Sequence, residues 1–442
     1  MNSNNSTIQC ESMIKNLLSP DNNLRKNAEI QLQQGLQNNQ TKEELCLHCS
    51  QLLLNSTDLS VKIYCAIIIR KIFLVNDDSK NDIIKTINPE NKNILKNNLF
   101  NALVNNLQNK NLNKKISDAI INVFTCISEN DENWDELLKY IISNFNLELN
   151  ENNLNAIELS LYLLSNVYGV AYDQLKEGIP IFLNCFKLYF NSNIVSLKAK
   201  TVECINELLC ATSSKKESKK FREFIFFILQ TTLQCLNEHS TENLKLCLDS
   251  LNDLTNCEPK ILRKSFNDIF ILMGKIIEDK NVEDNLREIS YELLINLIEQ
   301  MPKLIKDDDE KLSNLIQSLF KYAMEIESDI DEEWLTPKAT TFINDEFIPE
   351  HKLDESTSLL TRLFDALDEE KVLKIVSNNI SELIQHSNEK DWKYKYIAYI
   401  SIAEIISYVK ELTHVEKIIE MILNDVNNNN IKIQYAALYC IA

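Results

Sequence analysis

The chain has 442 residues, 44% of them hydrophobic, so it is long enough for several domains or for one repetitive array. It contains 4 glycines and 7 prolines, too few for the turns of an all-β fold or for glycine-rich nucleotide-binding loops. The 65 acidic and 46 basic residues give a net charge of −19, which argues against nucleic-acid binding and favours basic partners.

Apolar residues recur at helical spacing, and the segments are separated by breaks rich in Asn, Asp, Ser or Pro. The breaks recur about every 40 residues, which is typical of HEAT or armadillo repeats with two helices per unit. The predicted units span residues 8–36, 41–75, 89–128, 131–169, 171–213, 218–257, 259–302, 309–367, 369–409 and 411–442. This pattern predicts an all-α HEAT-repeat solenoid, a superhelix of about ten antiparallel helix pairs, rather than an irregular helical bundle.

The second helix of several units shares one texture. A polar turn precedes a basic residue and then a dense face of Ala, Ile or Leu, as in residues 24–29, 197–200, 286–290, 392–398 and 431–437. Small residues would let these helices pack closely in a stack, because one pair cannot bury its apolar face alone. The last such helix runs to Ala442 without a polar cap, so we expect the solenoid to continue in a longer protein.

Motifs for catalysis or metal binding are weak. Cys46, His48 and Cys49 lie close together, but no second Cys/His pair with zinc-ligand spacing follows. The twelve cysteines are scattered and mostly lie in apolar runs, which predicts buried free thiols of a reducing compartment rather than a disulfide framework. GxSxG, HExxH and GxxxxGK[ST] patterns are absent, so we expect no metal, no cofactor and no enzymatic activity. A Cys/His nucleophile pair formed only in space stays open.

No run of about 18 uncharged apolar residues occurs, so we expect no membrane insertion.

Negative charge is concentrated in residues 301–370, which hold 19 acidic and 7 basic residues. The cluster at 307–310 suits a helix start, where carboxylates complement the helix dipole. An insertion at 325–349 contains a second cluster followed by an aromatic residue: Glu325, Glu327, Asp329, Asp331, Glu332, Glu333 and Trp334. This run is either a solvated, extended loop or an acidic arm for Lys/Arg-rich partners, with Trp334 available for cation–π contact.

Several stretches resemble the importin-β (karyopherin-β) family of nuclear transport receptors. Residues 17–29 are similar to the first-repeat signature of that family, and residues 114–119 with Asn133-Trp134 are similar to its third and fourth repeats. The acidic loop ending at Trp334 falls in the eighth unit, where the family has one, and residues 389–396 resemble its Asp-Trp-Lys-Tyr-Arg segment. These motifs are spread over the whole chain, in the order and at the spacing expected of the family.

The resemblance implies a receptor that shuttles between cytoplasm and nucleus and carries cargo through nuclear pores. It implies that Ran-GTP binds the second helices of the first repeats, where Arg25, Arg70, Lys71 and Lys115 are the candidates. It also implies that the acidic loop contacts Ran or cargo. The expected cargo is basic, such as ribosomal proteins or histones, which the net charge of −19 independently favours. Phe-Gly nucleoporins are expected in clefts between outer helices.

Four segments are expected. Residues 1–130 would form the Ran-GTP-binding repeats, 131–308 the middle repeats, 309–368 the repeat with the acidic loop, and 369–442 further repeats. The alternative is a HEAT-repeat scaffold subunit of a multiprotein complex, of the phosphatase type, which would not bind Ran. An enzyme with an unrecognised site is a third possibility without a supporting motif.

The acidic loop generates one prediction. Neutralising Asp329, Asp331, Glu332 and Glu333 together should weaken the binding of basic cargo or Ran, because long-range attraction is lost. The salt dependence of binding should also flatten, because fewer charges remain to be screened. Binding titrations at low and high salt check this. If the variant and the parent chain bind with the same affinity at both salt concentrations, the run is a solvated loop and not a binding arm.

Overall fold

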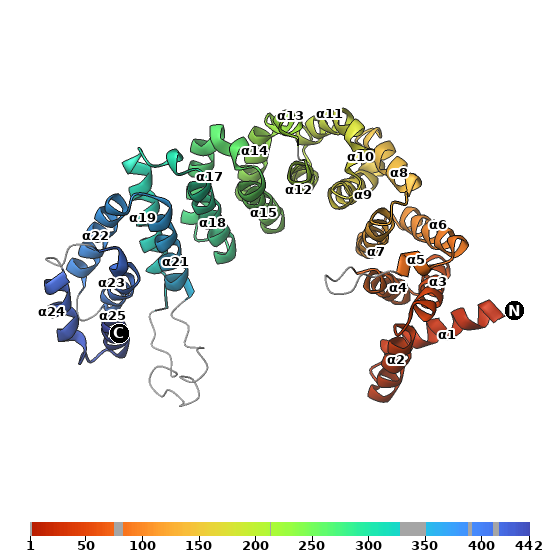
Figure 1. Cartoon of the computed structure of the whole chain (residues 1–442), viewed down its shortest axis with the longest axis horizontal. Coiled ribbons are helices and arrows are strands. Elements are labelled where there is room, and N and C mark those ends of the chain that lie inside the picture. Colours follow the sequence, from red (N-terminus) through yellow and green to blue (C-terminus); the bar gives the residue numbers. More distant parts are fainter. Residues whose placement is uncertain (1, 75–82, 213, 328–350, 388–390, 410–414) are drawn as a thin grey trace. The chain divides into compact units, whose positions relative to one another are not determined.

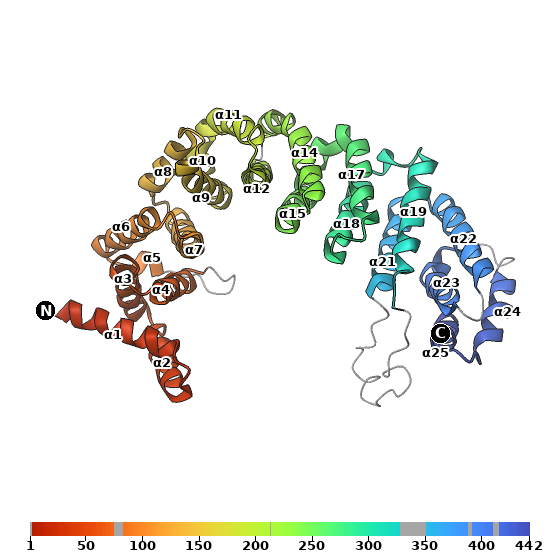
Figure 2. The ribbon, with the colours of Figure 1, turned by 180° about the vertical axis from the view of Figure 1, so that it is seen from behind.

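The computed structural model describes residues 2–74, 83–212, 214–327, 351–387, 391–409 and 415–442. These residues form helices, turns and bends, with no strand among them. The chain divides into two compact units, Met1–Arg222 and Glu223–Ala442. In each unit the first helix of every pair contributes to one layer, here called the A layer, and the second to the other, the B layer (Figures 1 and 2).

The first unit contains five helix pairs. Its A helices are α1 (Asn2–Leu17), α3 (Asn39–Asn55), α6 (Pro89–Asn105), α8 (Asp135–Phe145) and α11 (Ile179–Phe190). Its B helices are α2 (Asn22–Gly35), α4 (Leu59–Ile72), α7 (Lys110–Ser128), α9 (Glu151–Val167) and α12 (Val195–Ala211). Short helices and 3-10 turns complete it: α5 (Ile83–Thr86), α10 (Tyr172–Leu175), Lys176–Gly178, α13 (Lys215–Ser218) and Lys219–Phe221.

Among its described residues the second unit also contains five pairs. Its A helices are α14 (Phe224–Asn237), α17 (Phe266–Glu278), α19 (Asp309–Ala323), α22 (Glu369–His386) and α24 (Val415–Asp425). Its B helices are α15 (Thr241–Cys257), α18 (Asp284–Gln300), α21 (His351–Ala366), α23 (Trp392–Ile405) and α25 (Ile431–Ile441). A short helix, α16 (Pro259–Leu262), and 3-10 turns at Arg263–Ser265, Pro302–Leu304 and Ile406–Tyr408 join them. The ten predicted pairs and the all-α class are confirmed.

The polar residues at the sequence breaks cap the helices. Asp58, for example, accepts hydrogen bonds from the backbone N–H groups of Ser60 and Val61 at 2.9 and 3.4 Å. Equivalent N-caps with a side-chain acceptor are Asp21, Asn38, Asn88, Asn109, Asn150, Asp308, Asp368 and Asn430. Each such cap stabilises its helix by about 1 kcal/mol, which explains why Asn and Asp gather where helices begin.

Within each unit the B helices pack side by side. In the first unit α4 contacts α7, α7 contacts α9 and α9 contacts α12, while in the second unit the row runs α15, α18, α21, α23 and α25. The apolar faces between them are closed to solvent, as at Ile116, Leu163 and Ile205, each 0% exposed. Each pair is therefore stabilised mainly by its immediate neighbours.

The cysteines lie mostly in these apolar interfaces. Cys46 and Cys49 are free thiols with 1% and 0% exposure, and they pack as small hydrophobic residues. Ten of the twelve cysteines are free thiols, and Cys210 and Cys257 are the exceptions to the prediction. In the part of the chain that the structure describes, no group of three or more His, Cys, Asp or Glu is placed to hold a metal ion. None of the described helices is long and apolar enough to cross a membrane.

A buried carboxylate ties three B helices of the first unit together. Glu158 on α9 is 5% exposed and pairs with Lys200 of α12 at 2.7 Å and with Lys110 of α7 at 3.3 Å. Ser196 also donates to it at 3.2 Å. Burial opposes ionisation, but the hydrogen bonds and charges of the two lysines outweigh it and lower the pKa of Glu158.

Replacing Glu158 with Gln removes the charge that pairs with both lysines, so it should destabilise the protein at neutral pH. The loss should be only about 1–2 kcal/mol, because the two lysines can partly regain water. The pKa is lower in the folded chain than in the unfolded one, so this stabilisation is present above the unfolded pKa. It disappears as the pH falls through the folded value. Urea unfolding of Glu158→Gln and the parent chain checks this, and their difference should shrink on acidification. Glu151→Gln, exposed on the same helix, is the control and should change stability by less than about 0.5 kcal/mol.

Candidate partner-binding surfaces

The B layers of the two units carry opposite charge. The five B helices of the first unit hold ten Lys or Arg and six Asp or Glu, a net of +4. The five of the second unit hold seven basic and eleven acidic residues, a net of −4. Charge complementarity steers encounter and suppresses wrong partners, so the first B layer suits an acidic partner and the second a basic one.

The four basic residues predicted to contact Ran all lie on B helices of the first unit. Arg25 is on α2, Arg70 and Lys71 are in the last turn of α4, and Lys115 is on α7. Arg70 and Lys71 are exposed, whereas Arg25 and Lys115 are half-buried. The guanidinium of Arg25 donates to the side chain of Asn22 in the same turn. Lys71 and Lys115 have no ion-pair partner within the described ranges, so both charges remain available.

Arg70 is held by the neighbouring B helix. Its guanidinium lies 3.5 Å from Asp118 of α7, and its backbone carbonyl accepts a hydrogen bond from Asn122 at 3.1 Å. Asp118 also accepts from the Tyr162 hydroxyl at 2.7 Å. Burial and this hydrogen bond raise the pKa of Tyr162, so it stays a donor. The contacts fix where Arg70 lies but leave half of its side chain exposed.

The predicted acidic loop is described only at its start. Asp329, Asp331, Glu332, Glu333 and Trp334 lie outside the described residues, whereas Glu325 and Glu327 lie inside them.

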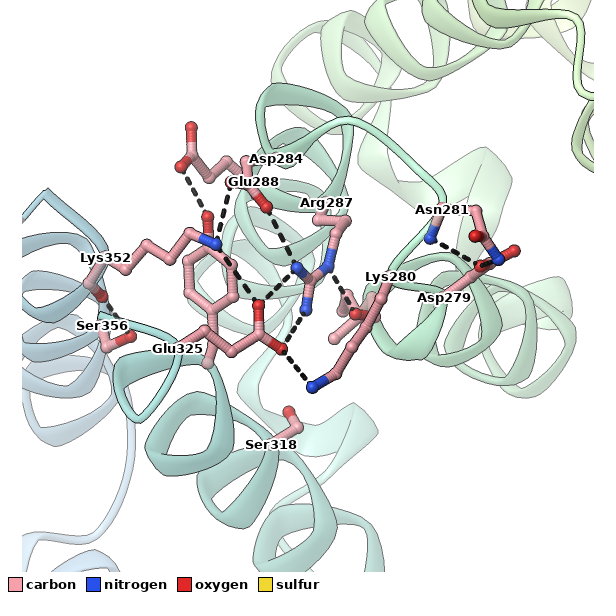
Figure 3. A network of polar contacts seen from close by, with 12 residues as sticks. Asp279, Lys280, Asn281, Asp284, Arg287, Glu288, Ser318, Glu325, Lys352 and Ser356 are labelled. Carbon is pink, nitrogen blue, oxygen red and sulfur yellow. Dashed lines mark hydrogen bonds and ion pairs between the residues drawn. The ribbon is translucent and has the colours of Figure 1, made fainter. Parts of the chain in front are cut away.

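Glu325 follows α19 and lies at the centre of a polar network (Figure 3). Its two oxygens accept hydrogen bonds from the Arg287 guanidinium at 2.7 and 2.9 Å. Lys352, in the first turn of α21, lies 3.3 Å away, and Lys280 lies 3.7 Å away. For Glu325 the expectation of an extended, solvated carboxylate is therefore wrong, because three cations of its own chain surround it.

Arg287 anchors this network in the interior of the second unit. Its side chain is 4% exposed, and its Nε donates to the backbone carbonyl of Ile277 at 2.8 Å. Asp284 accepts from the same guanidinium at 3.0 Å, and the ring of Tyr322 lies 4.9 Å from its centre. The hydrogen bond from Arg287 is the main cause that lowers the pKa of Glu325, against the effect of burial.

The exposed face of α18 carries a row of polar side chains that sequence reasoning missed. Glu288, Glu292, Asn296 and Glu299 follow one another at helical spacing and are all partly exposed. Glu355 of α21 belongs to the same face. Burial raises the pKa of Glu355, and the charges of Glu292 and Glu288 raise it further, which marks an excess of negative potential. The signal in the sequence was the spacing of carboxylates along one helix, which does not reveal whether the chain neutralises them.

The sequence and the fold both match known proteins. A family model described as IPO5-like, TPR repeats, matches residues 108–272. Importin subunit beta-3 of Saccharomyces cerevisiae (strain ATCC 204508 / S288c) is 22% identical over 432 residues, which cover 96% of this chain and 38% of that protein.

Two solved structures of Kap121p show the same fold. The crystal structure of Kap121p has a TM-score of 0.72 and 19% identity over 99% of this chain and 40% of that one. Kap121p bound to RanGTP matches with the same TM-score, identity and coverage. The chain thus spans about two fifths of the length of the relatives it matches.

The network around Glu325 generates a stability prediction. Glu325→Gln removes the charge that pairs with the buried Arg287, so it should destabilise the protein by about 3 kcal/mol. Glu327→Gln is the control, because Glu327 is exposed and should change stability by less than about 0.5 kcal/mol. Urea unfolding of both variants checks this. Equal stability of the two variants would mean that Arg287 finds sufficient compensation elsewhere.

Proposed function

We propose that the chain is a member of the importin-β family and acts in nuclear import as a receptor whose two B layers bind different partners. The observation that carries the proposal is the opposite charge of those layers, +4 in the first unit and −4 in the second. A receptor that binds basic cargo and releases it when an acidic regulator binds needs one acidic surface and one basic surface. The function proposed is binding and transport between cytoplasm and nucleus, not catalysis.

The first B layer is proposed to bind the GTP-bound form of Ran. Kap121p, of the same fold, has been crystallised bound to RanGTP, which supports the assignment. Arg70, Lys71 and Lys115 present their charges on adjacent helices α4 and α7, which contact each other. Arg25 on α2 belongs to the same layer, although its guanidinium is partly occupied by Asn22.

The second B layer is proposed to bind basic cargo, such as ribosomal proteins or histones. Glu288, Glu292 and Glu355 crowd one face there, and a partner's Lys or Arg would relieve their mutual repulsion. Kap121p bound to Pho4p and Kap121p bound to Nup53p are further structures of this fold. They support cargo and nucleoporin partners for this chain too, and Phe-Gly segments are the proposed nucleoporin contact. The loop from Asp329 to Trp334 remains a candidate contact for cargo or Ran.

The alternative is a HEAT-repeat scaffold of a multiprotein complex with no Ran binding. It would share the helix pairs and the acidic face of the second unit. Only the basic face of the first unit distinguishes the two, because a scaffold has no need to recognise the nucleotide state of a GTPase.

Binding to Ran locked in the GTP state, with Ran-GDP as the comparison, tests the proposal. The chain should bind the GTP form selectively. The double reversal Arg70→Glu with Lys71→Glu should weaken binding about tenfold or more, because each reversed surface contact costs roughly 1 kcal/mol.

Two charge reversals in the A layer are the matched control. Lys42→Glu with Lys139→Glu changes the net charge equally, on α3 and α8, and should leave affinity within about twofold. Circular dichroism confirms that each variant is folded. A folded chain without GTP selectivity would contradict the import receptor and favour the scaffold, and equal losses in both double variants would contradict the assignment to the B layer.

A further inference from the structure

The acidic face of the second unit is already occupied by a side chain of the protein itself. Arg362 of α21 reaches across to α18, where its Nη1 donates to both oxygens of Glu292 at 2.9 and 2.8 Å. Its Nε and Nη2 donate to the two oxygens of Glu299 at 2.8 and 2.9 Å. Nη2 also donates to the side-chain oxygen of Asn296 at 2.6 Å. These contacts use all five N–H donors of a guanidinium.

The contact lies at the surface and not in the interior. Arg362 is 28% exposed, and Glu292 and Glu299 are each 33% exposed, so a partner can reach all three. The buried arginine of the same unit is different, because Arg287 is 4% exposed and is bonded to a backbone carbonyl. All five hydrogen bonds that Arg362 makes to the described residues end on side chains, so its release would leave no buried backbone group unpaired.

The subsite is shaped for a guanidinium. Two carboxylates and one amide oxygen receive a planar fork of donors, an arrangement that a lysine ammonium with three donors on one atom cannot reproduce. A second hydrogen bond orients the side-chain amide of Asn296. Its nitrogen donates to Asn252 of α15 at 2.8 Å, which turns its oxygen toward Arg362. The subsite therefore lies on α18, α15 positions its amide, and α21 supplies the arginine that occupies it.

We propose that Arg362 is a tethered pseudo-ligand, which holds the arginine-binding subsite of Glu292, Asn296 and Glu299 until an arginine of a basic partner displaces it. This inference rests on the proposed binding of basic cargo. The exchange replaces one set of guanidinium contacts with an equivalent set, so it gains little free energy. A tethered group also competes at an effective concentration of about millimolar. Arg362 therefore lowers the affinity of this face for arginine.

A selectivity follows from the same geometry. Glu355 has no ion pair among the residues that the structure describes, so a partner's lysine can bind there without displacing Arg362. Arginine, which gains most from the fork, must compete with Arg362 for the better subsite. Relative to lysine-rich segments, arginine-rich segments should therefore bind the wild-type face less tightly than its negative charge alone would predict.

Two labelled peptides test this on the full chain, an oligo-arginine and an oligo-lysine of equal length, titrated by fluorescence anisotropy at low salt. Arg362→Met should bind oligo-arginine on the order of tenfold more tightly, because the tethered competitor is gone. Its gain for oligo-lysine should be clearly smaller. Lys245→Met is the matched control, since it removes the same charge from a B helix of the same unit outside the subsite. It should raise both affinities slightly and equally.

Arg362→Lys keeps the charge but loses the fork, so it should give a smaller gain for oligo-arginine in the same direction. If circular dichroism shows that Arg362→Met does not fold, Arg362→Lys takes its place in the test. The inference is overturned if oligo-arginine binds the folded variants no more tightly than the wild type, or if the gain equals that of Lys245→Met. If the wild type still binds both peptides, the proposed cargo function survives that failure. If neither the wild type nor any variant binds either peptide, both fall.

Discussion

The structure depends on one packing constraint: a helix pair of this size cannot bury its own apolar faces and must be covered by the next pair. The consequence is visible in the B layers, where successive helices contact one another from α4 to α12 in the first unit and from α15 to α25 in the second. Side chains on these helices, such as Ile116 and Leu163, are closed to solvent. Stability in such an array is approximately a sum of nearest-neighbour contributions.

The same constraint limits how far polar interactions extend. Glu158 joins α7, α9 and α12, and Asn296 joins α15, α18 and α21, so each polar tie spans consecutive B helices. Burial strengthens these hydrogen bonds, and the two lysines keep the buried charge of Glu158 from being isolated. The polar contacts therefore fix the register of neighbouring repeats, while hydrophobic burial holds them together.

Because packing consumes only one stripe of each B helix, the other stripe is free to carry charge. The first unit uses it for an excess of cations and the second for an excess of anions, on the same architecture. Burial then decides what each charged group does. Arg287 and Glu325 are largely enclosed and act as structural anchors, whereas Arg362 meets Glu292 and Glu299 at the surface, where exchange with a partner is possible.

The sequence by itself determined the fold class, the ten helix pairs and most helix starts, since all three follow from local periodicity and capping chemistry. It also placed Arg70 and Lys115 on second helices correctly. It did not reveal the partners of Glu325 and Arg362, because these contacts join residues 27 to 70 positions apart. Their formation depends on the register between neighbouring repeats, and helical spacing within one segment carries no information about that register. Only the tertiary structure decided which charges are neutralised internally and which remain for a partner.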